Sequence, residues 1–158
     1  MSQPDGQNLL TVQIDERSLS PVSRDQEQER QVAIFDLLAQ NHFFPVQGGQ
    51  GPFDLGLSLI DGRLALDIAG PGYQRRNMLS LTALRGVIKD YFLVCETYYD
   101  AIRNATPHQI EALDMSRRAL HDEGSLLLQG RLDGKVEVDM PTARRLFTLI
   151  CALYRRSA

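Results

Sequence analysis

The chain has 158 residues, of which 43% are hydrophobic and 23% are charged, and its formal net charge is −3. This composition is typical of a globular domain and excludes a fibrous or largely disordered protein. The slightly acidic balance gives no support for general nucleic-acid binding, which usually accompanies a basic surplus.

Segments that could target the chain or anchor it are not found in the sequence. No apolar run approaches the ~18 residues of a membrane span, and the first residues lack the basic and apolar regions of a secretion signal. Cys95 and Cys151 lie in apolar helical patterns, as buried thiols of a reducing compartment do. We therefore expect a cytoplasmic protein, not bound to a membrane, with a disordered tail over residues 1–8 and a single domain over residues 9–158.

The N-terminal third predicts a strand, a helix and a loop. Apolar and polar residues alternate over residues 10–14, as in a half-buried strand. Ser23 and Gln26 form a capping-box pattern at the start of a helix that should stop near Asn41. Glycines recur over residues 47–52, but a strand pattern follows them instead of a helix. We interpret this stretch as a flexible loop and not as a phosphate-binding loop.

A β-hairpin is predicted between Phe53 and Ala69. Its centre, Asp61-Gly62, is typical of a two-residue hairpin turn. The predicted pairs are Ile60–Arg63, Leu59–Leu64, Leu57–Leu66 and Leu55–Ile68. Strand side chains alternate, so the leucines share one face that must pack on something apolar. Residues 73–78 follow the hairpin and are interpreted as a polar linker.

Two long helices are predicted next. Over residues 80–105 the apolar positions recur every three or four residues and form a wide stripe. We expect this helix to be buried on more than half its circumference, as the spine on which the hairpin packs. Thr106, Pro107 and Gln109 form a start signal for a second helix, which turns back at a tight corner and runs to about Leu132.

A short strand over residues 135–139 and a final helix from about Pro141 to Arg156 complete the pattern. The sequence thus predicts an α+β fold of one domain. Two long antiparallel helices and two further helices should pack on a small antiparallel sheet that contains the hairpin.

The second long helix carries the main candidates for binding. Arg117 interrupts an otherwise apolar stripe, and a guanidinium there must pair with a carboxylate or a bound anion. The structural alternative is an internal ion pair with Asp114 or Asp90, or a side chain whose charged end extends to solvent. The functional alternative is an anion site built from Arg117, Arg118 and His121.

Arg144 and Arg145 extend this candidate set. They stand in the first turns of the last helix, where the helix dipole disfavours cations, so we expect an acidic partner for them or a share in the anion site. Gly124 leaves a gap on the second long helix where another backbone or a ligand could approach closely.

Catalysis is the weakest of the three functional interpretations. His121 with Asp122 or Glu123 could serve a hydrolase or transferase, and Ser125 lies one turn away. A triad also needs a strained turn for the nucleophile and an oxyanion hole, which the pattern does not contain. The three histidines lack the spacing of a metal site. We therefore predict no catalytic residues, no metal and no cofactor.

Four segments are similar to a known family. They are ERQVAIFDLL, LSLTALRGVIKDYFLVCETYYDAIR, TPHQIEALDMSRRALHDEGS and TARRLFTLICALYRR. From about Leu9 onward the chain resembles a bacterial family of alphaproteobacteria, numbered two-six-two in the series of uncharacterised protein families. The resemblance implies a cytoplasmic bacterial protein and brings no catalytic or binding residues with it.

Our first functional expectation is a non-enzymatic interaction or regulatory module that binds a protein partner or a second copy of itself. The alternative is a protein that binds a small anion or a nucleotide phosphate. Convergence of Arg117, Arg118 and His121 in a concave pocket would favour that alternative. Pairing of each with a carboxylate on a flat surface would disfavour it. Nucleic acid is not expected, because no aromatic series lies between the arginines.

Overall fold

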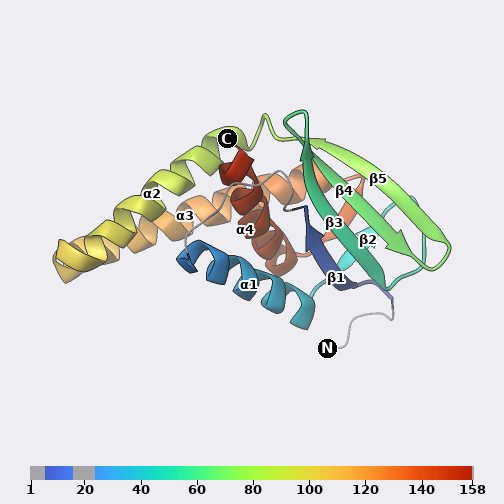
Figure 1. Ribbon diagram of the computed structural model, residues 1–158, viewed down its shortest axis with the longest axis horizontal. Coiled ribbons are helices and arrows are strands. Elements are labelled where there is room, and N and C mark those ends of the chain that lie inside the picture. Colours follow the sequence, from blue (N-terminus) through green and yellow to red (C-terminus); the bar gives the residue numbers. More distant parts are fainter. Residues whose placement is uncertain (1–5, 16–23, 158) are drawn as a thin grey trace.

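The computed structural model describes residues 6–15 and 24–157, which form the helices and strands drawn in Figure 1. They are β1 (Leu9–Ile14), α1 (Arg24–Ala39), β2 (Phe43–Pro45), β3 (Phe53–Ile60), β4 (Arg63–Gly70), β5 (Tyr73–Ser80), α2 (Arg85–Asn104), α3 (Pro107–Leu132), β6 (Val136–Val138) and α4 (Met140–Ser157). The expected α+β domain is confirmed. The predicted capping box at Ser23 lies outside the described residues. Gln7 and Asn8, placed in the tail by the sequence, accept hydrogen bonds from the backbone N–H groups of Phe43 and Phe53.

The main sheet has the strand order β1-β3-β4-β5 and contains the predicted hairpin. The four predicted residue pairs of β3 and β4 are confirmed, Leu57 opposite Leu66 among them. Asp61 and Gly62 have positive φ angles of 52° and 76°, as a turn of this hand requires. The sheet is mixed and not wholly antiparallel, because β1 runs parallel to β3.

Two strands were missed by the sequence patterns. Residues 73–78, interpreted as a linker, belong to β5, which pairs with β4. Arg76 there lies opposite Asp67 and donates two hydrogen bonds to its carboxylate, at 2.6 and 3.1 Å. Such cross-strand charge pairs stabilise a polar edge strand. β2 forms a second sheet with β6, where the wholly buried Phe43 lies opposite Val138.

The core helix is α4 and not α2. In α2 only Val87 and Ile88, near its N-terminal end, are buried, so the predicted spine is wrong. In α4, Leu146, Phe147 and Ile150 are buried, and this helix contacts α1, α3 and β3. Figure 1 shows the reason, since α2 and α3 form a two-helix hairpin that extends well beyond the rest of the molecule.

The corner between the two long helices is as predicted. Thr106 caps α3 by accepting a hydrogen bond from the Gln109 backbone N–H, while the Gln109 side chain accepts one from the Thr106 backbone N–H. The helix begins at Pro107 and ends at Leu132. Within the described part of the chain, none of the helices combines the length and the apolar character needed to cross a membrane.

Candidate functional site

A groove of about 870 Å³ lies where the four helices meet. We call it the arginine groove. All five residues predicted as a binding site line it, and they are Arg117, Arg118, His121, Arg144 and Arg145. The remaining lining residues are Gln28, Glu29, Val32, Ala33 and Asp36 of α1, Tyr91 and Tyr99 of α2, Asp122 of α3 and Thr148 of α4. The structure therefore brings together on one concave surface what the sequence placed on two separate helices.

Arg117 and Arg118 share one carboxylate on α3. An Arg117 nitrogen lies 2.6 Å from an Asp114 oxygen, and Nε of Arg118 lies 3.1 Å from the other oxygen. The hydrogen bond from Arg117 holds the pKa of Asp114 below its usual range. The ion pair predicted as the structural alternative for Arg117 is thus present, with Asp114 as the partner.

The pairing with Asp114 does not satisfy the whole Arg117 side chain. Its guanidinium carbon lies 5.0 Å from the centre of the Tyr98 ring, within the range of a cation–π contact. Its Nε is buried and has no hydrogen-bond partner among the described residues. The Nε–H group of Arg117 is therefore a hydrogen-bond donor at the groove that lacks an acceptor among the described residues.

His121 is held in place by the side chains around it. Its Nε2 lies 2.9 Å from Oγ1 of Thr148. The centre of its ring lies 5.4 Å from that of Tyr91 and 5.3 Å from that of Phe147. Burial lowers the pKa of His121 and outweighs the opposing effect of the Asp122 carboxylate. The imidazole is therefore neutral near pH 7 and fixed at the floor of the groove.

The two arginines of α4 differ in their pairing. Arg144 forms an ion pair with Asp122 of α3, at 2.9 Å, which confirms the expected acidic partner for one of them. Arg145 is partly buried and makes no ion pair or hydrogen bond with another described residue. Its guanidinium is free to receive a ligand.

The groups considered for catalysis are engaged in other contacts. The Ser125 side chain is wholly buried and donates a hydrogen bond of 2.7 Å to the carbonyl of His121, so it is not presented to the groove. Asp122 is paired with Arg144, and Glu123 is exposed and does not line the groove. Among the described residues, no three His, Cys, Asp or Glu side chains gather closely enough to hold a metal ion.

The gap predicted at Gly124 is filled from within the protein. The ring of Phe147 lies against it, and a Cβ built at Gly124 would stand 2.1 Å from the ring atom Cζ. Gly124 therefore allows α3 and α4 to pack closely and leaves no room for a ligand.

One wall of the groove was not foreseen from the sequence. It is formed by α1, where Glu29, Val32 and Asp36 face the arginines of α3 and α4. These positions are three and four residues apart, the spacing of one helix face. Without the tertiary arrangement, such a mixed polar and apolar face is indistinguishable from an ordinary solvated one. Tyr99 of α2 closes this end, where its hydroxyl hydrogen-bonds to Glu29.

Acid should destabilise the protein through His121. Because the folded state disfavours its protonation, the unfolded chain binds the proton more readily, and the free energy of unfolding should fall as the pH drops below about 6.5. His121→Phe keeps an aromatic ring beside Tyr91 and Phe147 and should reduce this fall in the free energy of unfolding. Urea unfolding at about pH 7 and at about pH 5.5 measures the fall for each variant.

The matched control is His108→Gln, which changes an exposed histidine of the same helix. It should show the same decline as the wild type. Equal declines in the two variants would contradict the assignment to His121.

Comparison with known proteins places the chain among bacterial relatives. The model of a family described as "Uncharacterised protein family (UPF0262)" matches residues 6–156. A UPF0262 protein of Caulobacter vibrioides is 66% identical over 148 residues, covering 94% of this chain and 93% of the relative. One of Phenylobacterium zucineum is 64% identical with the same coverage, and one of Brucella canis is 54% identical, covering 94% of each chain. No solved structure matches.

Proposed function

The chain belongs to the Uncharacterised protein family (UPF0262), whose description names no activity, and we propose that it is a non-enzymatic binding module whose arginine groove holds an anionic ligand. The observation that carries this proposal is the convergence of four arginines from two helices on one groove. A guanidinium fork suits carboxylate and phosphate groups alike.

The balance of charge in direct contact with these arginines supports the proposal. Within residues 6–15 and 24–157, their four guanidinium groups contact only two carboxylates, since Arg117 and Arg118 share Asp114 and Arg144 pairs with Asp122. Arg145 adds a positive charge that no described residue neutralises. A bound anion would pair directly with Arg145, while Glu29 and Asp36 balance part of the charge from the opposite wall.

The shape of the groove agrees with a ligand larger than a single ion. Its volume of about 870 Å³ lies within the range of roughly 300–1,000 Å³ found for ligand pockets. Tyr91 and Val32 add apolar surface to the polar lining. This combination favours recognition of an extended molecule that carries its negative charge on one side. Cys95 and Cys151 are not joined in a disulfide, and this supports our further proposal that the module acts in the cytoplasm.

A titration with inorganic pyrophosphate tests the proposal. Amide shifts in nuclear magnetic resonance spectra of the wild-type protein should be centred on α3 and α4 at the groove. The double variant Arg118→Ala/Arg145→Ala should bind about tenfold more weakly, because two charge contacts open to solvent are lost and each contributes up to about 1 kcal/mol.

The control variant Arg63→Ala/Arg85→Ala removes the same charge from exposed positions outside the groove. It should bind pyrophosphate as the wild type does. If both double variants bind equally, or if the shifts lie elsewhere, the arginine groove is not an anion site.

A further inference from the structure

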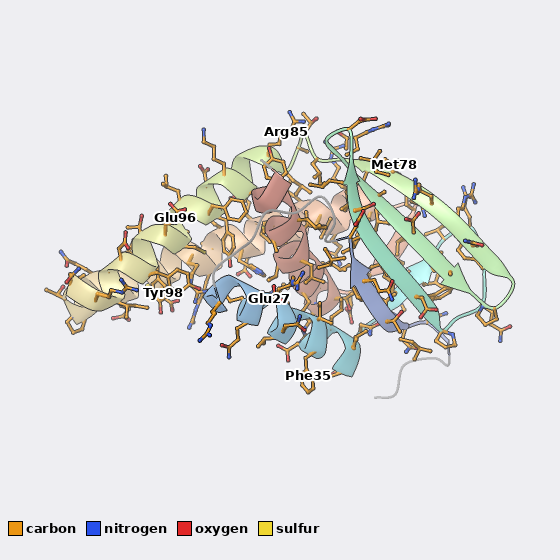
Figure 2. All side chains as sticks on the ribbon, in the orientation of Figure 1. Glu27, Phe35, Met78, Arg85, Glu96 and Tyr98 are labelled. Carbon is orange, nitrogen blue, oxygen red and sulfur yellow. The ribbon has the colours of Figure 1, made fainter. Side chains whose placement is uncertain are left out.

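The arginine groove continues into exposed apolar surface on α1. Val32 lines the groove and is 50% exposed, and Phe35, one turn further along the helix, is 73% exposed. We call these two residues the α1 ledge. Figure 2 shows Phe35 projecting from α1 away from the rest of the molecule. Isolated apolar side chains are common on protein surfaces, but this pair adjoins a groove lined with arginines.

The two walls of the groove carry opposite charges. Arginines lie on α3 and α4, whereas Glu29 and Asp36 lie on α1. Negative charge placed against α1 would meet repulsion from Glu29 and Asp36, whereas a small anion held at the arginines would not reach them. A ligand that fits both walls must present negative charge to Arg118 and Arg145, and apolar groups or hydrogen-bond donors to α1.

The exposure of Phe35 indicates the size of the occupant. Small-molecule pockets are concave and enclose most of their ligand, while Phe35 stands outside the groove. A ligand that contacts both the ledge and the arginines must therefore be long. Arginine and aromatic residues such as Phe35 and Tyr99 are also the types enriched at the energetic centres of protein interfaces.

We propose that the arginine groove and the α1 ledge together dock an acidic amphipathic segment of a partner protein. This inference rests on the proposed function and names the class of its ligand. Carboxylates of the segment bind Arg118 and Arg145, and an apolar side chain of the segment packs on Val32 and Phe35. A nucleic acid fits less well, because Glu29 and Asp36 would repel its continuous phosphate backbone.

Selection from a displayed library of random peptides of about 16 residues tests this inference, since that length spans a helix-in-groove contact. Sequences enriched on the wild-type protein should combine several Asp or Glu residues with apolar residues. The most enriched peptide is then synthesised with a fluorophore, and its affinity is measured by anisotropy. Phe35→Ala and Arg145→Ala should each weaken binding about tenfold, as the loss of a central interface residue does.

The matched control is Leu93→Ala, which removes an exposed side chain, 63% exposed, from α2 outside the groove. It should leave the affinity unchanged. Absence of enrichment, or equal affinities for the Phe35→Ala variant and the wild type, would overturn the inference. If pyrophosphate still binds in that case, the proposed anion site stands without a peptide ligand. Tighter binding of a random 16-nucleotide DNA than of the peptide would assign the groove to nucleic acid instead.

Discussion

Replacing Asn41 with alanine should lower the free energy of unfolding by about 3 kcal/mol. The Asn41 side chain is 3% exposed and joins the end of α1 to β1. Its Oδ1 accepts a hydrogen bond from the Leu9 N–H at 2.7 Å, and its Nδ2 donates to the carbonyls of Leu9 and Leu37 at 3.2 and 2.8 Å. Alanine would remove these three hydrogen bonds, at about 1–3 kcal/mol for each buried group that is left unsatisfied.

Urea unfolding of Asn41→Ala against Gln40→Ala provides the measurement. Gln40 is the neighbouring residue and is exposed, so its truncation should change stability by less than about 0.5 kcal/mol. If Asn41→Ala lowers the free energy of unfolding no more than Gln40→Ala does, the Asn41 hydrogen bonds between α1 and β1 do not stabilise the fold.

A second variant, Asn41→Asp, tests the donor role of the Asn41 side chain separately from its acceptor role. It keeps an acceptor for the Leu9 N–H but turns a carboxylate towards the carbonyls of Leu9 and Leu37, which raises the pKa of the new carboxyl group. The folded state then holds the proton more firmly than the unfolded chain. The free energy of unfolding of Asn41→Asp should therefore fall further below that of the wild type as the pH rises above about 4.

Asn41 also illustrates what the sequence could predict and what it could not. The pattern identified the end of a helix there, because the apolar periodicity stops. It could not show that the amide reaches a strand 32 positions earlier in the chain. The hairpin and the α3 cap were predicted to the residue because both depend on neighbours in the sequence, such as Asp61 with Gly62 and Thr106 with Gln109.

The error about the core helix has a related cause. Both α2 and α4 carry an apolar stripe, and a stripe does not reveal how much of it will be covered. The corner at Asn104 pairs α2 with α3 along their length, which leaves Tyr99 and Ile102 substantially exposed. In α4, the sheet, α1 and α3 together cover the stripe.

The sequence predicted the side of the candidate site formed by α3 and α4, but not the side formed by α1. Arginine pairs on α3 and α4 attract notice because cations on an apolar stripe or near a helix start are unfavourable. The α1 wall carries no such anomaly, since Glu29, Val32 and Asp36 are ordinary surface residues of a helix. Only the packing of α1 against α4 turns that face into one side of a groove.

Gly124→Ala should destabilise the protein by about 1–3 kcal/mol, although alanine is the better helix former. The added Cβ would lie 2.1 Å from Cζ and 2.3 Å from Cε1 of Phe147. The Phe147 ring is wholly buried and cannot swing into solvent. Overpacking therefore outweighs the gain of about 1 kcal/mol in helix propensity.

Gly130→Ala is the matched control in the same helix. Nothing lies within 4 Å of a Cβ at Gly130, and the site is exposed, so this variant should gain up to about 1 kcal/mol. Opposite signs for the two substitutions are the expected result of urea unfolding. If Gly124→Ala is also stabilising, α3 and α4 do not pack as closely as described.

The same substitution connects the core to the candidate site. The Phe147 ring lies edge-on to His121 at 5.3 Å and to Tyr91 at 5.9 Å, and both of those residues line the arginine groove. A ring displaced by the new methyl group must move them. Phe147→Leu should relieve part of the strain, so the double variant Gly124→Ala/Phe147→Leu should be more stable than the two separate losses predict. Additive losses would mean that the methyl group is accommodated without moving the ring, and that the floor of the groove does not depend on this contact.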